Sequence, residues 1–364
     1  MDRWFIVWGI YFICAVLIFD LTCFIAPFLQ RYSYLVAKTL FCAVIGHCLF
    51  IFIQEKVSKE RVNPNGKAVF ITGCDSGFGY QLAKQLHSLG YRVFAGCLFP
   101  ETGGAAELKN ECPGKMSIVH IDVTKDESVK KAKDFVLQNL KGCDLWALVN
   151  NAGIYKGFSV EFSKISDFQD SLDVNTLGQV RVTKAFLPLL RECKGRIINV
   201  NSLAGRIACA HMTAYSMSKF ASVCFTEGLR REMAPWGIKV ISIEPEFFKT
   251  PLTNKENLRK YLENTCAGVE NGIKFDYGEL YMDRIKAMLT DLFGLSSSKT
   301  HIVTDAIEAA ISTKHPCIVY RPSANIIRYI FWYYAEKVPS HVFDAFFKMG
   351  NIVWKIPAPK AART

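Results

Sequence analysis

The sequence predicts a doubly wound α/β fold, in which helices cover both faces of a parallel β-sheet. Three observations support this prediction: short β-branched runs alternate with helical stretches, a glycine-rich turn follows the first run, and polar motifs stand at the ends of later runs. Such alternation is typical of parallel strands joined by helical crossovers. The 364 residues suffice for one large or two modest domains with a sizeable core.

The composition excludes several classes of protein. Half of the residues are hydrophobic and the mean hydropathy is +0.15, which excludes a disordered or low-complexity chain. The 13 cysteines are odd in number and lack C-x-x-C or metal-type spacing, so we expect reduced thiols and no metal site. A net charge of +11 in so apolar a chain favours a membrane surface as partner, and we expect no binding of nucleic acid.

Residues 1–55 predict a membrane anchor of one or two helices. The stretch 4–19 has no charged residue, the apolar run resumes after Asp20, and a second run covers 39–53. A spanning helix needs about 20 apolar residues, so the first run is long enough, whereas the second spans, re-enters or lies in the interface. The first run is too long for a cleavable signal peptide, and a buried soluble hairpin is the alternative.

Basic residues around these runs predict the orientation of the anchor. Arg3 precedes the first run, and Lys56, Lys59 and Arg61 follow the second. With two spans, these residues share one side of the membrane, which the positive-inside rule makes cytosolic. With one span, they lie on opposite sides.

From residue 67 the pattern changes to alternating strands and helices. Short runs of β-branched and apolar residues predict strands at 67–72, 91–97, 117–123, 145–150, 195–201 and 239–244. Helical periodicity predicts helices at 80–89, 128–140, 180–191 and about 215–233. We therefore expect a domain over residues 56–320 that is built on a parallel sheet.

The first turn of this domain carries a phosphate-binding pattern. Residues 72–79 read TGCDSGFG and stand between a predicted strand and a predicted helix. Glycines there permit a tight turn and a close approach of the backbone to a pyrophosphate, which a helix N-terminus stabilises. An ordinary glycine-rich loop is the alternative. We predict that a dinucleotide contacts Thr72, Gly73, Asp75, Ser76, Gly77, Phe78 and Gly79.

A second pattern is spread over the later strand ends. Residues 150–153 read NNAG, Asn175 follows in LDVN, and Ser202 precedes a Tyr-x-x-x-Lys sequence formed by Tyr215 and Lys219. Tyr215 and Lys219 are four residues apart, so they share one face of a predicted helix. This order and spacing resemble the short-chain dehydrogenase/reductase family, over about residues 67–251.

The resemblance is closest to one branch of that family. FITGCDSGFG at 70–79, VFAGCL at 93–98 and YSMSKF at 215–220 are similar to membrane-bound retinol dehydrogenases, 17β-hydroxysteroid dehydrogenases and (R)-3-hydroxybutyrate dehydrogenase. The resemblance implies a Rossmann-type fold and an oxidoreductase that transfers a hydride between an alcohol and a nicotinamide cofactor. With the anchor, we expect the endoplasmic reticulum membrane and a cytosolic catalytic domain. A mitochondrial membrane is the alternative, and a homodimer is left open.

The second pattern also has a chemical rationale. A tyrosine has a pKa of about 10 and is a poor base at neutral pH, but a nearby ammonium favours the phenolate. We therefore predict that Tyr215, beside Lys219, removes the alcohol proton as general base. Ser202 is expected to hydrogen-bond the substrate oxygen. The resemblance implies that Lys219 also holds the nicotinamide ribose and that Asn175 holds a water linking Lys219 to solvent.

The resemblance assigns further cofactor contacts. Asp122 and Val123 end the third predicted strand, where the family contacts the adenine ring. Asn150, Ala152 and Gly153 match the segment that packs beneath the cofactor.

The segment after the sixth strand is expected to connect cofactor and substrate. Pro245 and Thr250 match family residues near the nicotinamide, but the family's glycine after the proline is replaced by Glu246. The resemblance therefore does not define the local backbone path at the nicotinamide. Phe247 and Phe248 are predicted to enter the substrate pocket, together with Ser202 and Tyr215.

The choice of cofactor depends on charges near the second strand. An acidic residue about 20 positions after the glycine motif would select NAD through its ribose 2′-hydroxyl, but none occurs until Glu101. The glycine loop and this strand end also lack Arg or Lys for a 2′-phosphate. Because the missing basic residues carry more weight, we expect NAD and consider NADP the less favoured cofactor.

The C-terminal third is expected to determine the substrate. Residues 252–298 should form a helical lid, and residues 321–364 form an aromatic, basic tail. In the tail, apolar residues fall on helical stripes that fit either a core or a membrane interface. One such stripe holds Ile326, Ile327, Ile330, Phe331 and Tyr334, and a second holds Phe343, Phe346 and Phe347.

Three functions fit these observations. The first is a membrane-anchored dehydrogenase that oxidises a lipophilic primary or secondary alcohol, such as a hydroxysteroid or retinoid, with NAD. The second is the same reaction on (R)-3-hydroxybutyrate, whose carboxylate requires a cationic partner. The third is a non-catalytic membrane protein on a dehydrogenase scaffold, which the intact set of Asn175, Ser202, Tyr215 and Lys219 disfavours.

Overall fold

The computed structural model describes residues 16, 20, 33–39, 42, 46 and 60–363. The chain divides into two units, Met1–Glu60 and Arg61–Thr364. Residues 33–39 are helical. The predicted membrane anchor at 1–55 lies almost entirely outside the described residues. Within the described ranges, every helix is too short or too polar to cross a bilayer.

The second unit is built on a parallel sheet of seven described strands. Its order is β3-β2-β1-β4-β5-β6-β7, and every neighbouring pair is parallel. The order reverses between β1 and β4, which is the switch point of a doubly wound fold. The strands are β1 (Lys67–Thr72), β2 (Arg92–Cys97), β3 (Met116–His120), β4 (Asp144–Asn150), β5 (Arg196–Val200), β6 (Lys239–Ile243) and β7 (Val319–Tyr320).

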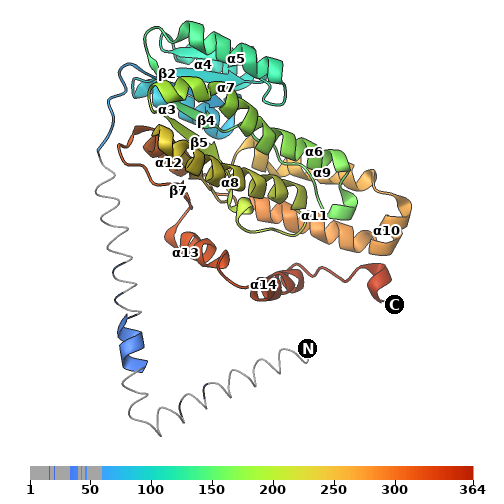
Figure 1. Ribbon diagram of the computed structural model, residues 1–364. Coiled ribbons are helices and arrows are strands. Elements are labelled where there is room, and N and C mark those ends of the chain that lie inside the picture. Colours follow the sequence, from blue (N-terminus) through green and yellow to red (C-terminus); the bar gives the residue numbers. More distant parts are fainter. Residues whose placement is uncertain are drawn as a thin grey trace. The chain divides into compact units, whose positions relative to one another are not determined.

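Helices cover both faces of this sheet, which confirms the predicted architecture (Figure 1). One face is covered by α3 (Gly77–Ser88), α4 (Gly103–Glu111) and α12 (His301–Ser312). The other face is covered by α5 (Asp126–Asn139), α7 (Gly178–Glu192) and α8 (Thr213–Met233). The connection from β4 to α7 contains α6 (Ile165–Leu172) and a π-helical turn, Asp173–Leu177.

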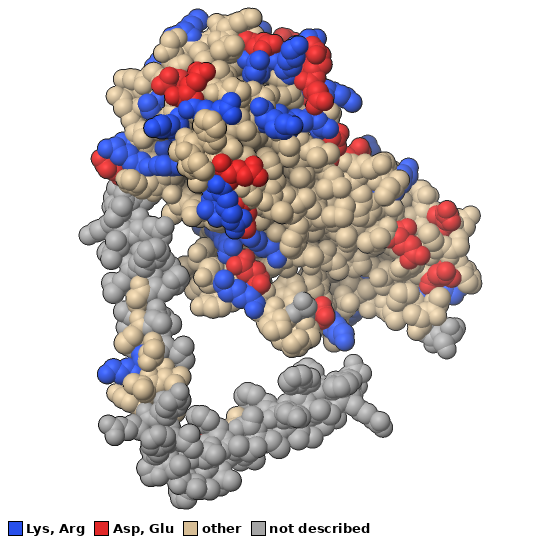
Figure 2. All heavy atoms as spheres, in the orientation of Figure 1, with Lys and Arg blue, Asp and Glu red and all other residues tan. Residues whose placement is uncertain are grey.

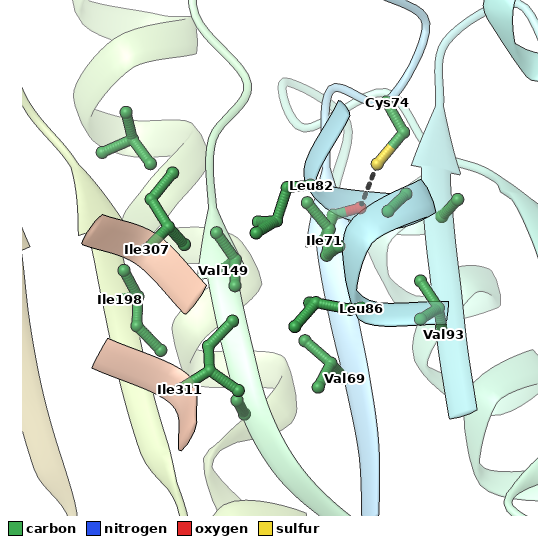
Figure 3. Packing of buried hydrophobic residues seen from close by; sticks show 14 of the residues in the cluster. Val69, Ile71, Cys74, Leu82, Leu86, Val93, Val149, Ile198, Ile307 and Ile311 are labelled. Atoms are coloured by element: carbon green, nitrogen blue, oxygen red, sulfur yellow. Dashed lines mark hydrogen bonds between the residues drawn. The ribbon is translucent and has the colours of Figure 1, made fainter. Parts of the chain in front are cut away.

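Branched aliphatic side chains make up most of the core between the sheet and helices α3 and α12. Figure 3 shows Leu82 and Leu86 of α3 and Ile307 of α12 together with Val69 and Val149 of the central strands. All five are fully buried. Strands buried on both faces favour such continuous apolar runs, and each buried side chain contributes about 1.5–3 kcal/mol. This core fixes the positions of the strand ends.

The third strand is shorter than predicted. It ends at His120, two residues before Asp122, which the sequence placed at the strand end. The Asp122 carboxylate accepts hydrogen bonds from the backbone N–H and the hydroxyl of Thr124, and the Asp122 N–H donates to Ser128 Oγ. These bonds turn the backbone away from the sheet. Asp122 and Val123 therefore stand in the turn before α5.

Residues 252–298, the predicted lid, contain three helices. They are α9 (Lys255–Ala267), α10 (Asn271–Tyr277) and α11 (Glu279–Gly294). Leu262, Ile285 and Leu289 of α9 and α11 pack with Tyr215 and Phe158 in an apolar cluster separate from the two faces of the sheet. The lid is thus attached to the helix that carries the predicted general base.

The tail after β7 forms α13 (Ile326–Ala335) and α14 (Ser340–Val353) (Figure 1). The first predicted stripe does not form core, because Ile326 and Ile327 are 67% and 76% exposed and Tyr334 is 61% exposed. In the second stripe, Phe343 packs partly buried against the cluster around Leu203. Figure 2 shows basic and acidic side chains interspersed on the visible face, beside a large uncharged area.

Candidate active site

A cavity of about 360 Å³ lies at the carboxyl ends of the central strands. This is the edge where doubly wound folds bind ligands. It collects the glycine loop after β1, the loops after β4, β5 and β6, the start of α8, and single residues of α11 and α13. Of the residues predicted from sequence, the lining includes Gly73, Asp75, Ser76, Gly77, Phe78, Ala152, Gly153, Ser202, Tyr215, Lys219, Pro245, Phe247, Phe248 and Thr250.

Six predicted residues do not line the cavity. They are Thr72, Gly79, Asp122, Val123, Asn150 and Asn175. The Thr72 hydroxyl accepts the backbone N–H groups of Asn151 and Ala152, at 3.0 Å each. Asn150 Nδ2 donates to Thr183 and Asn199. These side chains hold the strand-end loops in register.

The glycine loop leaves space that a side chain would fill. Gly73 has a φ of +72°, and a Cβ built there would lie 2.8 Å from Ala152 Cα. A Cβ at Gly79 would lie 2.3 Å from the Gly73 carbonyl oxygen. The loop therefore requires glycine and ends at the N-terminus of α3, whose backbone N–H groups attract anions. These residues fit the pyrophosphate of a dinucleotide.

Asp75 joins this loop to the end of β2. Its carboxylate accepts the backbone N–H of Leu98 at 3.0 Å and that of Phe99 at 2.8 Å. A residue of the glycine loop thus places a carboxylate at the end of β2, where the strand itself has no acidic residue. The sequence motif placed Asp75 in the loop, but its contact with β2 depends on the pairing of β1 and β2.

Asp122 is held in its turn by neighbouring groups. Partial burial raises the pKa of its carboxyl, but the hydrogen bonds from Thr124 and the charge of Lys125 outweigh that effect. The pKa of Asp122 is therefore lowered, and the carboxylate is ionised at neutral pH.

Tyr215 lies in the cavity wall in the first turns of α8. Burial raises the pKa of Tyr215 to about 12, and hydrogen bonding with Ser202 acts in the opposite direction. Ser202 Oγ also accepts the backbone N–H of Ala204 at 3.1 Å, because Ser202 caps a short 3-10 turn. The structure thus brings Ser202 and Tyr215 together, as the sequence spacing predicted.

Lys219 lies one turn further along α8. Its ammonium donates to the Val200 carbonyl at 3.1 Å and lies 5.8 Å from the centroid of the Tyr215 ring. Burial lowers the pKa of Lys219 to about 8. From the spacing of Tyr215 and Lys219, this ammonium is expected to bring the pKa of Tyr215 below its ordinary value. In this geometry burial dominates, and the pKa of Tyr215 lies above that value.

Asn175 is fully buried in the π-helical turn. Its Oδ1 accepts the N–H of Ile154 at 2.8 Å, and its Nδ2 donates to the Ile154 carbonyl at 2.9 Å and to Ser218 Oγ at 3.0 Å. Gly153 lies between Asn175 and Lys219. These contacts anchor the loop after β4 against α8. The implied role of Asn175 in holding a water stays a prediction.

The cavity includes aromatic residues that the sequence analysis did not select. The Tyr155 ring centroid lies 5.5 Å from that of Tyr215 and 5.2 Å from that of Phe293. Burial raises the pKa of Tyr155. Its position two residues after NNAG was a usable signal, since it places Tyr155 at a strand end. Trp332 and Phe293 also line the cavity, but they come from distant helices that no motif marks.

Known proteins are similar to this chain in sequence. A sequence profile described as short chain dehydrogenase matches residues 67–260. Mouse (Mus musculus) estradiol 17-beta-dehydrogenase 2 is 35% identical and aligns with 90% of this chain and 85% of its own length. Mouse retinol dehydrogenase 5 is 37% identical over 87% of this chain and 97% of its own. Rat (Rattus norvegicus) mitochondrial D-beta-hydroxybutyrate dehydrogenase is 37% identical, and the alignment covers 76% of this chain and 81% of the rat protein.

Solved structures agree with the fold. A short-chain dehydrogenase from Streptomyces avermitilis superposes with a TM-score of 0.60 at 23% identity, covering 79% of this chain and 96% of the other. A short chain dehydrogenase from Burkholderia cenocepacia in complex with NADP has a TM-score of 0.53 at 25% identity. The superposition covers 72% of this chain and 90% of the other. The fold of this chain therefore has counterparts of known structure.

Proposed function

We propose a substrate class on a premise that the comparisons establish: this chain belongs to the short-chain dehydrogenase family and is an oxidoreductase of CH–OH groups. The fold is one that binds nicotinamide dinucleotides. The proposed reaction is the oxidation of a lipophilic primary or secondary alcohol, a hydroxysteroid or a retinoid, with NAD. One observation carries the proposal: Ser202, Tyr215 and Lys219 meet in a cavity whose remaining wall is largely aromatic and aliphatic.

The residues of the cavity divide the chemistry between them. NAD, when bound, supplies the acceptor for the hydride. Ser202 is oriented by its bond from the Ala204 N–H and donates its hydroxyl hydrogen to the substrate oxygen. Tyr215, as its phenolate, accepts the alcohol proton and becomes a neutral phenol, and Lys219, charged below about pH 8, favours that phenolate before the transfer. Lys219 and Thr250 would hold the nicotinamide end of the cofactor.

The lining favours a lipophilic substrate over a small acid. Tyr155, Phe247 and Phe293 surround the space beside Tyr215. Among the lining residues that the structure describes, Lys219 is the one basic side chain, and its ammonium already donates to a carbonyl. A hydroxybutyrate carboxylate would thus lack a dedicated cation. Each buried methylene of an apolar alcohol would instead contribute about 0.8 kcal/mol.

The position of Asp75 supports NAD over NADP. Its carboxylate lies at the backbone of Leu98 and Phe99, at the end of β2, where the 2′ position of the adenosine ribose is held in this fold. A carboxylate accepts a hydrogen bond from a 2′-hydroxyl, whereas it repels a 2′-phosphate. The glycine loop offers no basic side chain that would offset this repulsion.

A substrate panel tests the proposed function. The purified protein in detergent or liposomes is assayed with NAD and with hydroxysteroids, retinol and 3-hydroxybutyrate. We expect kcat/KM for at least one lipophilic alcohol to exceed that for 3-hydroxybutyrate by at least a hundredfold. Brisk oxidation of 3-hydroxybutyrate without activity on any lipophilic alcohol would support the alternative, which similarity to the rat enzyme favours. NAD binding without turnover of any substrate would instead indicate a non-catalytic protein.

The location proposed for the enzyme is the endoplasmic reticulum membrane, with the catalytic domain in the cytosol. The two apolar runs in residues 1–55 and the basic residues Lys56, Lys59 and Arg61 support it. Protease treatment of intact microsomes should then digest the domain. Protection from protease would reverse the topology, and recovery of the protein in mitochondria would favour the alternative membrane.

A further inference from the structure

Two buried glutamates on either side of Pro245 have no part in the proposed reaction. Glu244 and Glu246 follow β6, and their side chains are each 1% exposed. A buried carboxylate is costly unless hydrogen bonds and opposite charges compensate it. The hydrogen-bond and ion-pair partners of these two carboxylates therefore show which part of the chain is bound next to β6.

Glu246 binds the C-terminal tail. Its Oε2 accepts the Arg328 Nε–H at 2.9 Å and the Trp332 indole N–H at 3.0 Å, while its Oε1 accepts the backbone N–H of Ala324 at 2.6 Å. These donors lie 78 to 86 residues further along the chain. Donors in and just before α13 thus offset the cost of burying the Glu246 carboxylate. The same bonds attach α13 to the segment after β6.

Glu244 extends this connection to the loop of the catalytic serine. It accepts Arg206 Nη2 at 2.8 Å, and Arg206 stands four residues after Ser202. It also accepts Arg321 Nε at 3.1 Å, and Arg321 pairs with Glu336 at the end of α13. The chain of charges therefore joins the serine loop to both ends of the tail helix.

Trp332 is the member of this assembly that reaches the cavity. It lines the cavity together with Glu246, Leu203 and Ile207. Its ring packs against the cluster of Leu203, Ile207 and Ala335. The indole is thus fixed by apolar contacts and by one hydrogen bond, whose acceptor is the Glu246 carboxylate.

We propose that Trp332 is a specificity-determining residue of the substrate cavity and that Glu246 is the residue that positions it. The substrate class rests on the proposed function. An indole presents a large, rigid apolar surface, and here it comes from α13, outside both the parallel sheet and the lid. The tail helix therefore supplies one wall against which the apolar body of an alcohol packs. The reacting oxygen lies at Ser202 and Tyr215.

Kinetics of four variants test the proposal. Trp332→Ala removes the wall, and Glu246→Gln presents an amide N–H₂ to donors that need an acceptor. Both should raise KM for the preferred lipophilic alcohol about tenfold, with kcat within threefold and an unchanged Kd for NAD. Trp332→Phe, which keeps a ring, should restore most of the KM. Ile327→Ala, on the exposed side of the same helix, is the matched control and should leave all three constants unchanged.

Two kinetic results would overturn the proposal. An unchanged KM in Trp332→Ala would remove the indole from the substrate wall. A parallel loss of kcat and of NAD affinity in Glu246→Gln would indicate general damage to the fold instead of a positioning role.

A second readout does not depend on substrate. Trypsin cleavage after Lys337, directly following α13, should be at least fivefold faster in Glu246→Gln than in the wild type, while cleavage after Lys109 in α4 should not change. Both lysines are exposed, so the comparison reports how firmly the tail is held. Equal cleavage after Lys337 would refute the positioning role. If the wild type oxidised no lipophilic alcohol, the proposed function would fail, but this experiment would still decide whether Glu246 holds the tail.

Discussion

The two ends of the cavity are built in different ways. At the cofactor end, Thr72 and Asn151 join the glycine loop to the loop after β4, and Asn151 Nδ2 donates to the carbonyls of Thr72 and Gly73 at 2.9 and 3.0 Å. These partners are neighbours because β1 and β4 are paired strands. At the substrate end, Glu246 depends on Arg328 and Trp332 of α13, a helix that follows the last strand of the sheet. The cofactor end thus follows from the sheet, whereas the substrate end requires a separate segment.

The largest effect should come from the residue at which the two ends meet. Tyr215→Phe preserves shape and burial but removes the proton acceptor, so kcat should fall by about a thousandfold. The Kd for NAD should stay within twofold, as measured by quenching of protein fluorescence. Tyr155→Phe alters the adjacent ring and should lower kcat less than tenfold. Equal losses in the two variants would contradict the role of Tyr215 as the base.

A methyl group in the glycine loop should damage the cofactor end alone. In Gly79→Ala the new Cβ would meet the Gly73 carbonyl oxygen at 2.3 Å, so the loop must shift. We expect the Kd for NAD to rise about a hundredfold by calorimetry, a loss of about 2.7 kcal/mol of binding free energy. Gly272→Ala in α10, where the added carbon meets open space, should bind NAD normally. Unchanged affinity in Gly79→Ala would show that the loop is not the cofactor cradle.

A smaller effect should follow from the charge of Asp75. Asp75→Asn keeps one acceptor for the backbone of Leu98 and Phe99 but removes the negative charge. The preference for NAD over NADP, measured as a ratio of kcat/KM values, should fall about tenfold, or about 1.4 kcal/mol. Glu101→Gln is the matched control, because it removes an exposed charge near the same strand end. A ratio that falls equally in both variants would assign the effect to net charge.

The last expected effect is a change in folding stability at the substrate end. Burial lowers the pKa of His211 to about 4, and Ser159 Oγ lies 2.7 Å from its Nδ1. Between about pH 6.5 and 4 the unfolded chain binds a proton that the folded chain does not, so stability falls as the pH falls through this window. We expect about 2 kcal/mol, after discounting for partial exposure.

His211→Asn should abolish that slope while accommodating the left-handed backbone, φ +63°, which asparagine tolerates. Urea unfolding at pH 6.5 and at pH 4.5 measures the difference. An equal pH dependence in the wild type and the variant would assign the slope to other groups.

The difference between the cofactor end and the substrate end also explains which features could be predicted from the sequence. The strand ends, the glycine loop and the pair of Tyr215 and Lys219 were accessible, because strand and helix periodicity and glycine spacing are local signals. The fold class followed from them. The true end of β3 was missed because a side-chain turn at Asp122 interrupts a run that is apolar in composition.

Other features depend on contacts that have no local signal. The sequence identified Glu246 as a departure from the family glycine, but its partners Arg328 and Trp332 lie more than 80 residues away. The direction of the Tyr215 pKa was also missed, because it is determined by burial, to which the lid helices contribute. Charge arguments from spacing alone omit this desolvation.

The attachment of the tail to Glu244 and Glu246 also determines the order in which the two ends of the cavity can form during protein synthesis. Protein synthesis proceeds from the N-terminus, so the strands β1 to β6 leave the ribosome before Arg321, Arg328 and Trp332. Until these residues emerge, Glu246 lacks Arg328 and Trp332, and Glu244 has Arg206 but lacks Arg321, so hydration must stabilise the carboxylates in their place. A nascent chain can therefore complete its dinucleotide cradle while still attached to the ribosome, but it can complete its substrate cavity only after the tail has been released from the exit tunnel.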